Sequence, residues 1–169
     1  MRAVWLVLVA GFRRQWRSWV LLSLLIAVAA AVRADRGAGR IPFALCASAG
    51  STNTGAVDPL AGLADVCAAE GLWLHVDAAY GGFAALTAKG KALLAGLERA
   101  DSVTLDPHEW LYQPMECGCV LIRDGARLER TFAIHPDYLD GDATQGAGEV
   151  NFADRACSCP AASGRSRCG

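Results

Sequence analysis

Three groups of polar residues in this sequence could do chemistry together, because each directly follows a short apolar run. They are Ser51-Thr52-Asn53 after IPFALCAS, Asp77 after LWLHV, and Asp106 with His108 after SVTL. A short apolar run that ends in polar or small residues is typical of a buried strand. Each residue alone would more often be a turn, cap or surface residue. Only their joint arrangement indicates a site.

Helical patterns separate these runs. Asp58 is a plausible N-cap for a helix that Pro59 opens and Gly71 ends, with an apolar face at positions 60, 63, 66 and 67. A second helix is expected over 90–100, with Leu93, Leu94 and Leu97 inward, and a further strand over 117–123. Strands separated by helices predict an α/β fold with a mostly parallel sheet, and sites in such sheets gather at the carboxyl ends of strands. We therefore expect the three polar groups to face one pocket.

The polar groups lie within three motifs that occur in a fixed order: AGSTNTGAVDP, LHVDAAYGG and DPHEWLYQP. Together they resemble the pyridoxal-phosphate-dependent amino-acid decarboxylases, the group that contains the aromatic-L-amino-acid, glutamate and cysteine-sulfinate enzymes. The resemblance implies that residues 33–154 are part of the large domain of a fold-type I enzyme. It also implies pyridoxal 5'-phosphate as cofactor, an amino acid as substrate and a cytoplasmic location.

Residue by residue, the resemblance assigns the cofactor site to the strand ends. Asp77 would hold the pyridine nitrogen in its protonated form, which makes the ring an electron sink. Ala79 would lie under the ring, where a small side chain allows close stacking. Thr52 would line the site with its hydroxyl, Asp106 would shape the phosphate end, and His108 would lie beside the cofactor. No metal ion is implied.

Glu109 occupies the position of the family's Schiff-base lysine. A carboxylate cannot condense with an aldehyde, and its negative charge adds to that of a phosphate-bearing cofactor. The sequence therefore predicts an inactive copy, a pseudoenzyme, with Glu109 and His108 at the catalytic positions. The family's N-terminal portion and C-terminal small domain, which supply much of its dimer interface, have no counterpart here, so a stable dimer is not predicted.

Residues 1–32 are apolar, with a basic interruption at Arg13, Arg14 and Arg17. The uncharged run Ser18 to Val32 is 15 residues long, short of the ~20 needed to span a bilayer. Such a segment suits a signal peptide, a signal anchor or an interfacial helix, and it resembles the start of an ABC-transporter permease. A buried helix of a soluble domain is less favoured, because no polar stripe interrupts the apolar residues. We expect a membrane contact through residues 1–32.

Charge and cysteine content exclude other classes. A net charge of −1 lacks the basic surface that nucleic acids require. Seven cysteines form no regular disulfide framework, and the pairs Cys117-x-Cys119 and Cys157-x-Cys159 are spaced too closely for a usual zinc site. Residues 155–169 have no periodicity and are expected to be disordered. A coding string for them can be read in another frame as a decarboxylase-like continuation, which favours a frameshifted tail.

Three functional interpretations remain open from the sequence. The first is a truncated, inactive decarboxylase. The second is a membrane-anchored protein whose decarboxylase-like domain binds a ligand or partner without catalysis. The third is a rearranged reading frame with no selected product.

Overall fold

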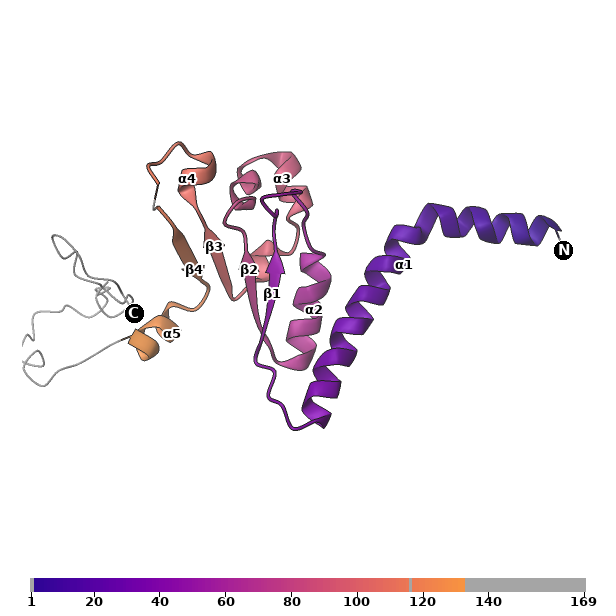
Figure 1. Ribbon diagram of the computed structural model, residues 1–169, viewed down its shortest axis with the longest axis horizontal. Coiled ribbons are helices and arrows are strands. Elements are labelled where there is room, and N and C mark those ends of the chain that lie inside the picture. The colour runs from indigo at the N-terminus through magenta and orange to yellow at the C-terminus, as the bar shows by residue number, and fades with distance from the viewer. Residues whose placement is uncertain (1, 116, 133–169) are drawn as a thin grey trace, which may run out of the picture. The chain divides into compact units, whose positions relative to one another are not determined.

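The computed structural model describes residues 2–115 and 117–132, which form a small α/β domain and a following helix (Figure 1). The chain divides into two compact units, residues 1–121 and 122–169. The predicted tail at 155–169 lies outside the described residues. In chain order the elements are α1 (Arg2–Gly37), β1 (Ala44–Ser48), α2 (Leu60–Glu70), β2 (Trp73–Asp77), η1 (Gly82–Leu86), α3 (Ala88–Leu93), η2 (Leu97–Arg99), β3 (Ser102–Leu105), α4 (Pro107–Trp110), β4 (Cys119–Ile122) and α5 (Gly125–Phe132).

The strands form one sheet in the order β1-β2-β3-β4. β1 pairs with β2 in parallel, with Ser48 opposite Asp77, and β2 pairs with β3 in parallel, with Asp77 opposite Thr104. Parallel neighbours need crossover connections, which α2 supplies between β1 and β2, and η1, α3 and η2 supply between β2 and β3. The predicted α/β architecture with a mostly parallel sheet is confirmed.

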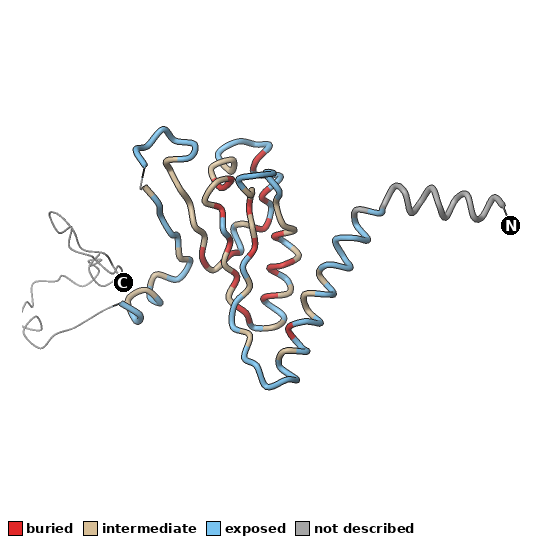
Figure 2. Tube along the Cα trace, in the orientation of Figure 1, coloured by how far each residue is buried: buried red, intermediate tan, exposed pale blue. Residues whose placement is uncertain are grey.

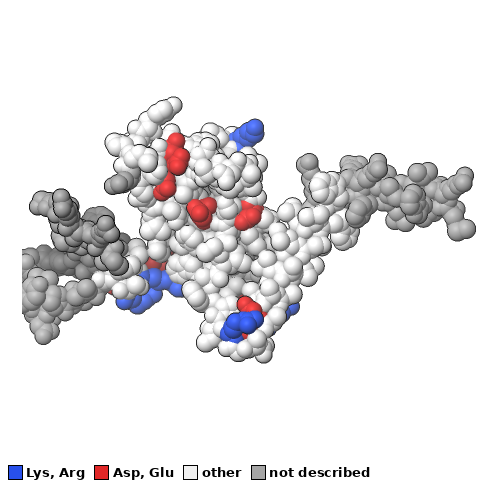
Figure 3. Space-filling model, in the orientation of Figure 1, with Lys and Arg blue, Asp and Glu red and all other residues white. Residues whose placement is uncertain are grey.

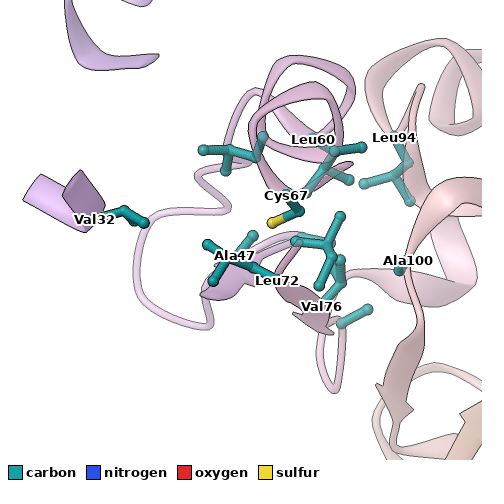
Figure 4. Packing of buried hydrophobic residues seen from close by; sticks show 13 residues of the cluster. Val32, Ala47, Leu60, Cys67, Leu72, Val76, Leu94 and Ala100 are labelled. Atoms are coloured by element: carbon teal, nitrogen blue, oxygen red, sulfur yellow. The ribbon is translucent and has the colours of Figure 1, made fainter. Parts of the chain in front are cut away.

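The core lies between α2 and the sheet (Figure 4). Leu60 and Leu63 from α2 and Leu74 and Val76 from β2 are almost completely buried. The buried segments are concentrated in α2 and β2, whereas those residues of α1 whose burial is described, 16 and 18–37, are mostly exposed (Figure 2). Burial of such side chains contributes roughly 1.5–3 kcal/mol each, as an upper estimate. This packing fixes the positions of the strand ends.

The ends of α2 confirm one expected cap and correct the other. Gly71 ends the helix in the left-handed conformation at φ 63°, which a residue without Cβ adopts readily. Asp58 does not cap the helix, because its carboxylate accepts the backbone N–H of Ser48 at 2.7 Å instead. Asp58 thus ties the start of α2 to the end of β1.

The helix expected over 90–100 is divided into α3 and η2. Gly96 stands between them at φ 101°, and a Cβ there would overlap the backbone of Ala61 in α2. Leu94 is buried as expected, and Leu97 is half-buried, but Leu93 points outward and is 61% exposed. A break that brings backbone close to α2 changes the helical phase, so periodicity alone placed Leu93 wrongly.

Helix α1 is a continuous apolar helix from Arg2 to Gly37. Its stretch Ser18–Gly37, with a mean hydropathy of 1.7, is the only one in the described part of the chain that is long and apolar enough to cross a membrane. A signal sequence or a core helix passes the same test. The C-terminal part of α1 contacts α2, so this helix belongs in part to the domain.

Candidate functional site

Backbone hydrogen bonds join the carboxyl ends of β1, β2 and β3. The N–H of Ala49 donates to the carbonyl of Asp77 at 2.8 Å, and the N–H of Ala78 donates to the carbonyl of Thr104 at 3.1 Å. Beyond the strands, the N–H of Asp106 donates to the carbonyl of Ala79 at 3.1 Å. The structure therefore brings Asp77, Ala79 and Asp106 to one edge of the sheet.

The loop that carries Thr52 is held against the segment after β2 by two glycines. Gly50 has a φ of 100°, and a Cβ added at Gly81 would overlap the carbonyl oxygen of Ala49. Only residues without a side chain permit this backbone approach. The loop then turns back on itself, because the N–H groups of Gly50 and Ser51 both donate to the carbonyl of Ala56 at 3.0 Å. Thr52 is exposed in the turn.

The Asp77 carboxylate lies at the open end of β2. The residue is exposed, and its Oδ1 accepts the N–H of Ala79 at 3.1 Å. Ala78, between them, is completely buried. The alternation of the strand thus sends Ala78 into the core and leaves the Asp77 carboxylate at the surface. A carboxylate in this position can accept a hydrogen bond from a cationic ring nitrogen.

Helix α4 is a single turn that carries the DPHEW motif. Pro107 occupies its first position, and the N–H of Glu109 donates to the carbonyl of Asp106 at 3.1 Å. The His108 Nδ1 lies 2.9 Å from the carbonyl oxygen of Cys117. A carbonyl can only accept, so Nδ1 carries the proton and donates. The His108 Nε2 lies 3.8 Å from Glu109 Oε1.

One further contact holds α4 beside the strand ends, and a second brings the segment before β4 close to Asp106. The rings of Tyr80 and Trp110 meet edge to face, with centroids 6.1 Å apart and planes at 84°, a favourable aromatic geometry. A Cβ added at Gly118 would lie 3.1 Å from Asp106 Oδ1. The segment before β4 therefore passes close to the Asp106 carboxylate.

The Tyr80–Trp110 pair and a polar network on one face of the sheet were not predicted from the sequence. In that network the Ser102 hydroxyl lies 2.8 Å from both Trp73 Nε1 and His75 Nδ1, and Thr104 Oγ1 lies 3.3 Å from His75 Nε2. The sequence contains a signal for this network. Side chains alternate between the two faces of a strand, and these residues occupy every second position of β2 and β3, so they share one face. Tyr80 and Trp110 lie within the quoted motifs themselves.

The residues fit a protonated aromatic ring better than a covalently attached one. Asp77 offers a carboxylate at the strand end, and Ala79 offers little bulk next to it. Glu109 offers no amine. The only lysines of the sequence, Lys89 and Lys91, are exposed on α3. No group of three metal-ligating side chains occurs within residues 2–115 and 117–132.

A family model described as the pyridoxal-dependent decarboxylase conserved domain matches residues 23–156. The match begins inside the apolar N-terminal segment, ten residues before Arg33. The segment boundaries at residues 32 and 154 remain predictions.

Curated relatives and solved structures agree with that match. The aromatic-L-amino-acid decarboxylase of Bacillus atrophaeus is 50% identical over 123 residues, which cover 73% of this chain and 26% of the relative. The L-2,4-diaminobutyrate decarboxylase of Rhizobium meliloti is 46% identical over 119 residues, covering 70% and 24% of the two chains. The structure of Oryza sativa TDC with PLP and tryptamine superposes with a TM-score of 0.70 at 37% identity, over 77% of this chain and 26% of that one.

A structure of mouse CSAD gives a TM-score of 0.69 at 34% identity, over 80% of this chain and 27% of that one. The chain thus spans about a quarter of the length of each relative it matches. The match to the family model, the identities and the shared fold all concern the segment that carries the three motifs. This chain belongs to the pyridoxal-dependent decarboxylase family.

Proposed function

We propose that this chain is a catalytically silent copy of a pyridoxal-phosphate-dependent amino-acid decarboxylase, which retains a ring-binding edge and lacks the means of covalent attachment. The observation that carries the proposal is Glu109 on α4, the helix that follows Asp106 at the joined strand ends. Pyridoxal phosphate, when bound, supplies an aromatic ring that accepts the electrons released from an amino acid on loss of carbon dioxide.

The proposed roles of the protein groups come from the family resemblance, and the positions of these groups at the strand ends support them. Asp77 accepts a hydrogen bond from the ring nitrogen and keeps it protonated, and Ala79 leaves room for the ring. Thr52 contributes a hydroxyl from the loop that Gly50 and Gly81 hold in place. Asp106 and His108 shape the site from the α4 side. Glu109 places a second carboxylate there and gives no nucleophilic nitrogen.

Noncovalent capture is the activity that this set of residues supports. A carboxylate favours a cationic ring nitrogen, and binding through that contact does not require a lysine. We therefore expect pyridoxamine phosphate, which has no aldehyde, to bind as well as pyridoxal phosphate does. The amino-acid side chain that the family's substrate would carry is not specified, because the relatives act by name on aromatic amino acids and on diaminobutyrate alike.

Equilibrium dialysis of the full chain against pyridoxamine phosphate tests this proposal. Asp77→Asn should weaken binding by about ten- to a hundredfold, since a hydrogen bond between charged groups contributes roughly 1.5–3 kcal/mol. The matched control is Asp65→Asn, which removes an exposed carboxylate on α2, where Asp65 pairs with Arg99.

Two outcomes would contradict the proposal. Equal loss of binding in both variants would show that general charge, and not the Asp77 contact, holds the ligand. Release of labelled carbon dioxide from carboxyl-labelled amino acids by the unmodified chain would contradict catalytic silence.

The second candidate function is a membrane-associated form of the same silent domain. The apolar stretch of α1 favours it, whereas the family by itself implies a cytoplasmic location. Recovery of the chain in the soluble fraction without detergent would count against this association. We do not propose the family's dimer for this chain.

A further inference from the structure

The C-terminal half of helix α1 packs against the domain. In its C-terminal half, Val32 is buried in the core, with Leu25 and Val28 packed against it. Leu25 lies so close to Gly62 of α2 that a Cβ at Gly62 would be 2.5 Å from the Leu25 Cδ1. This half of α1 is therefore part of the folded domain.

Two ion pairs fasten the same half of α1 to the end of α2. The Glu70 carboxylate binds Arg33 at 2.9 Å and Arg36 at 2.6 Å, and Arg36 also donates to the Glu70 carbonyl. The Glu70 side chain is only 8% exposed. Arg36 thereby satisfies a carbonyl in the last turn of α2, which has no partner within its own helix.

This packing leaves too little of α1 to cross a bilayer. With residues from Leu25 onward held on α2, the remaining uncharged runs are Ala3–Phe12 and Ser18–Leu24, of ten and seven residues. At 1.5 Å per residue they extend about 15 Å and about 10 Å, against a hydrocarbon core of about 30 Å. Neither run spans a membrane while the domain stays folded.

The outward face of α1 is nevertheless apolar. Trp19, Val20 and Ile26 are 52%, 55% and 61% exposed. The helical spacing of these three residues places them on one side of the helix, together with Ser23 and Ala27. This side is opposite the side that carries Leu25, Val28 and Val32. Figure 3 shows the described part of α1 as a largely uncharged surface, with charged atoms gathered toward its C-terminal end. Such a face suits the boundary between lipid headgroups and acyl chains.

The charge of the N-terminal segment favours a lipid surface over a second copy of the chain as the partner of the apolar face of α1. The first 32 residues contain Arg2, Arg13, Arg14 and Arg17 and no acidic residue, whereas Arg33 is already paired with Glu70. Anionic lipids attract such a segment by about 1 kcal/mol for each basic residue near the surface. Two copies packed through α1 would bring like charges together and be repelled. Tryptophan at the edge of the apolar face is also typical of the membrane interface.

We propose that α1 binds an anionic lipid surface in the plane of the interface, through the face that carries Trp19, Val20 and Ile26, while its C-terminal half stays packed on α2. The chain is then a peripheral membrane protein. The inference does not depend on cofactor binding, since it uses no residue of the strand ends.

Co-sedimentation of the full chain with lipid vesicles tests the proposal. Vesicles of phosphatidylcholine and phosphatidylserine should bind the chain, whereas phosphatidylcholine alone should bind it at least tenfold less, and raised salt should weaken the binding. Alkaline carbonate should release the bound chain. The Val20→Glu/Ile26→Glu variant should lose binding by roughly tenfold or more. The matched control is Leu86→Glu/Leu93→Glu, which adds the same charge at two exposed leucines away from α1.

Three results would overturn the proposal. Retention after carbonate treatment would show a spanning helix and require α1 to leave α2. Equal binding to neutral and anionic vesicles would remove the role of charge. Equal loss in the control variant would show that added negative charge alone prevents binding. The comparison of the two vesicle types uses the unmodified chain, so it holds even if a variant fails to fold.

Discussion

A carboxylate at position 109 alters the charge of the strand ends as well as their chemistry. Asp77 and Asp106 already contribute carboxylates near the ends of β2 and β3, and Glu109 adds another on α4. A phosphate-bearing ligand is repelled by each of them. Asp77, which favours binding of a protonated ring, and Glu109, which prevents its covalent attachment, therefore both lie near the strand ends.

Cysteine reactivity is set by burial in this domain. Burial raises the pKa of the Cys67 thiol above its ordinary value, and the negative charge of Asp101 raises it further. Cys46 and Cys119 are exposed. We expect iodoacetamide at about pH 8 to label Cys46 and Cys119 well before Cys67, because the thiolate is the reactive form. Peptide mapping over a time course measures this order.

The same pKa shift has a consequence for stability. The folded state holds the Cys67 proton more tightly than the unfolded chain does, so this contribution is complete below the ordinary thiol pKa of about 8.5 and is lost as pH rises through the folded pKa. Cys67→Ala should remove that part of the alkaline loss. Labelling of Cys67 as fast as Cys46 at neutral pH would contradict its burial.

At the scale of elements, the contact between the loop after β1 and the segment after β2 decides whether the strand ends form one site. Gly81 is buried there, with no room for a Cβ beside the Ala49 carbonyl. Gly81→Ala should lower the free energy of unfolding by about 1–3 kcal/mol, as overpacking does. Urea unfolding followed by circular dichroism measures the change.

Gly37→Ala is the matched control for that substitution. Gly37 ends α1, and a Cβ there would meet nothing within 4 Å. Its replacement should change stability by a few tenths of a kcal/mol at most. A destabilisation of similar size in both variants would mean that the close approach at Gly81 does not constrain the fold.

The positions of β2 and β3 could be predicted from the sequence, because an apolar run that ends in polar residues marks a buried strand and its end. The runs at 72–77 and 102–106 became β2 and β3 within one residue at each end. Asp58 could not be placed correctly, because its bond to Ser48 depends on tertiary proximity of β1 and α2. Leu93 was misplaced for a similar reason, since the break at Gly96 follows from contact with Ala61.

At the scale of the whole molecule, the apolar sequence of α1 suits two environments, a lipid surface and the protein core. Its uniform apolarity predicted a helix in contact with lipid and disfavoured a packed one, but Val32 and the two arginines on Glu70 tie half of it to the domain. Hydropathy averages over all faces of a helix and does not record which face another element covers. The packing of α1 also depends on its ion pairs with Glu70, which is distant in the sequence and does not enter the hydropathy of α1.

The candidate site was predicted as a set of residues at the ends of neighbouring strands, but the contacts between them were not predicted. The motifs named Asp77, Ala79 and Asp106, and the structure joins their backbones at one edge. The roles of all the named site residues toward a ligand, those of Asp77, Ala79 and Asp106 included, remain proposals. Since the chain spans about a quarter of the length of its relatives, the rest of a family site would come from parts of the relatives that this chain does not match.

Intact-mass measurement after treatment with pyridoxal phosphate and borohydride tests the central claim most directly. The unmodified chain should gain no reduced adduct above the background at exposed Lys89 and Lys91. Glu109→Lys should gain one adduct that maps to the substituted position, whereas Glu109→Gln, which only removes the charge, should gain none. A stoichiometric adduct on the unmodified chain, or a folded Glu109→Lys variant with no adduct at that position, would contradict the account.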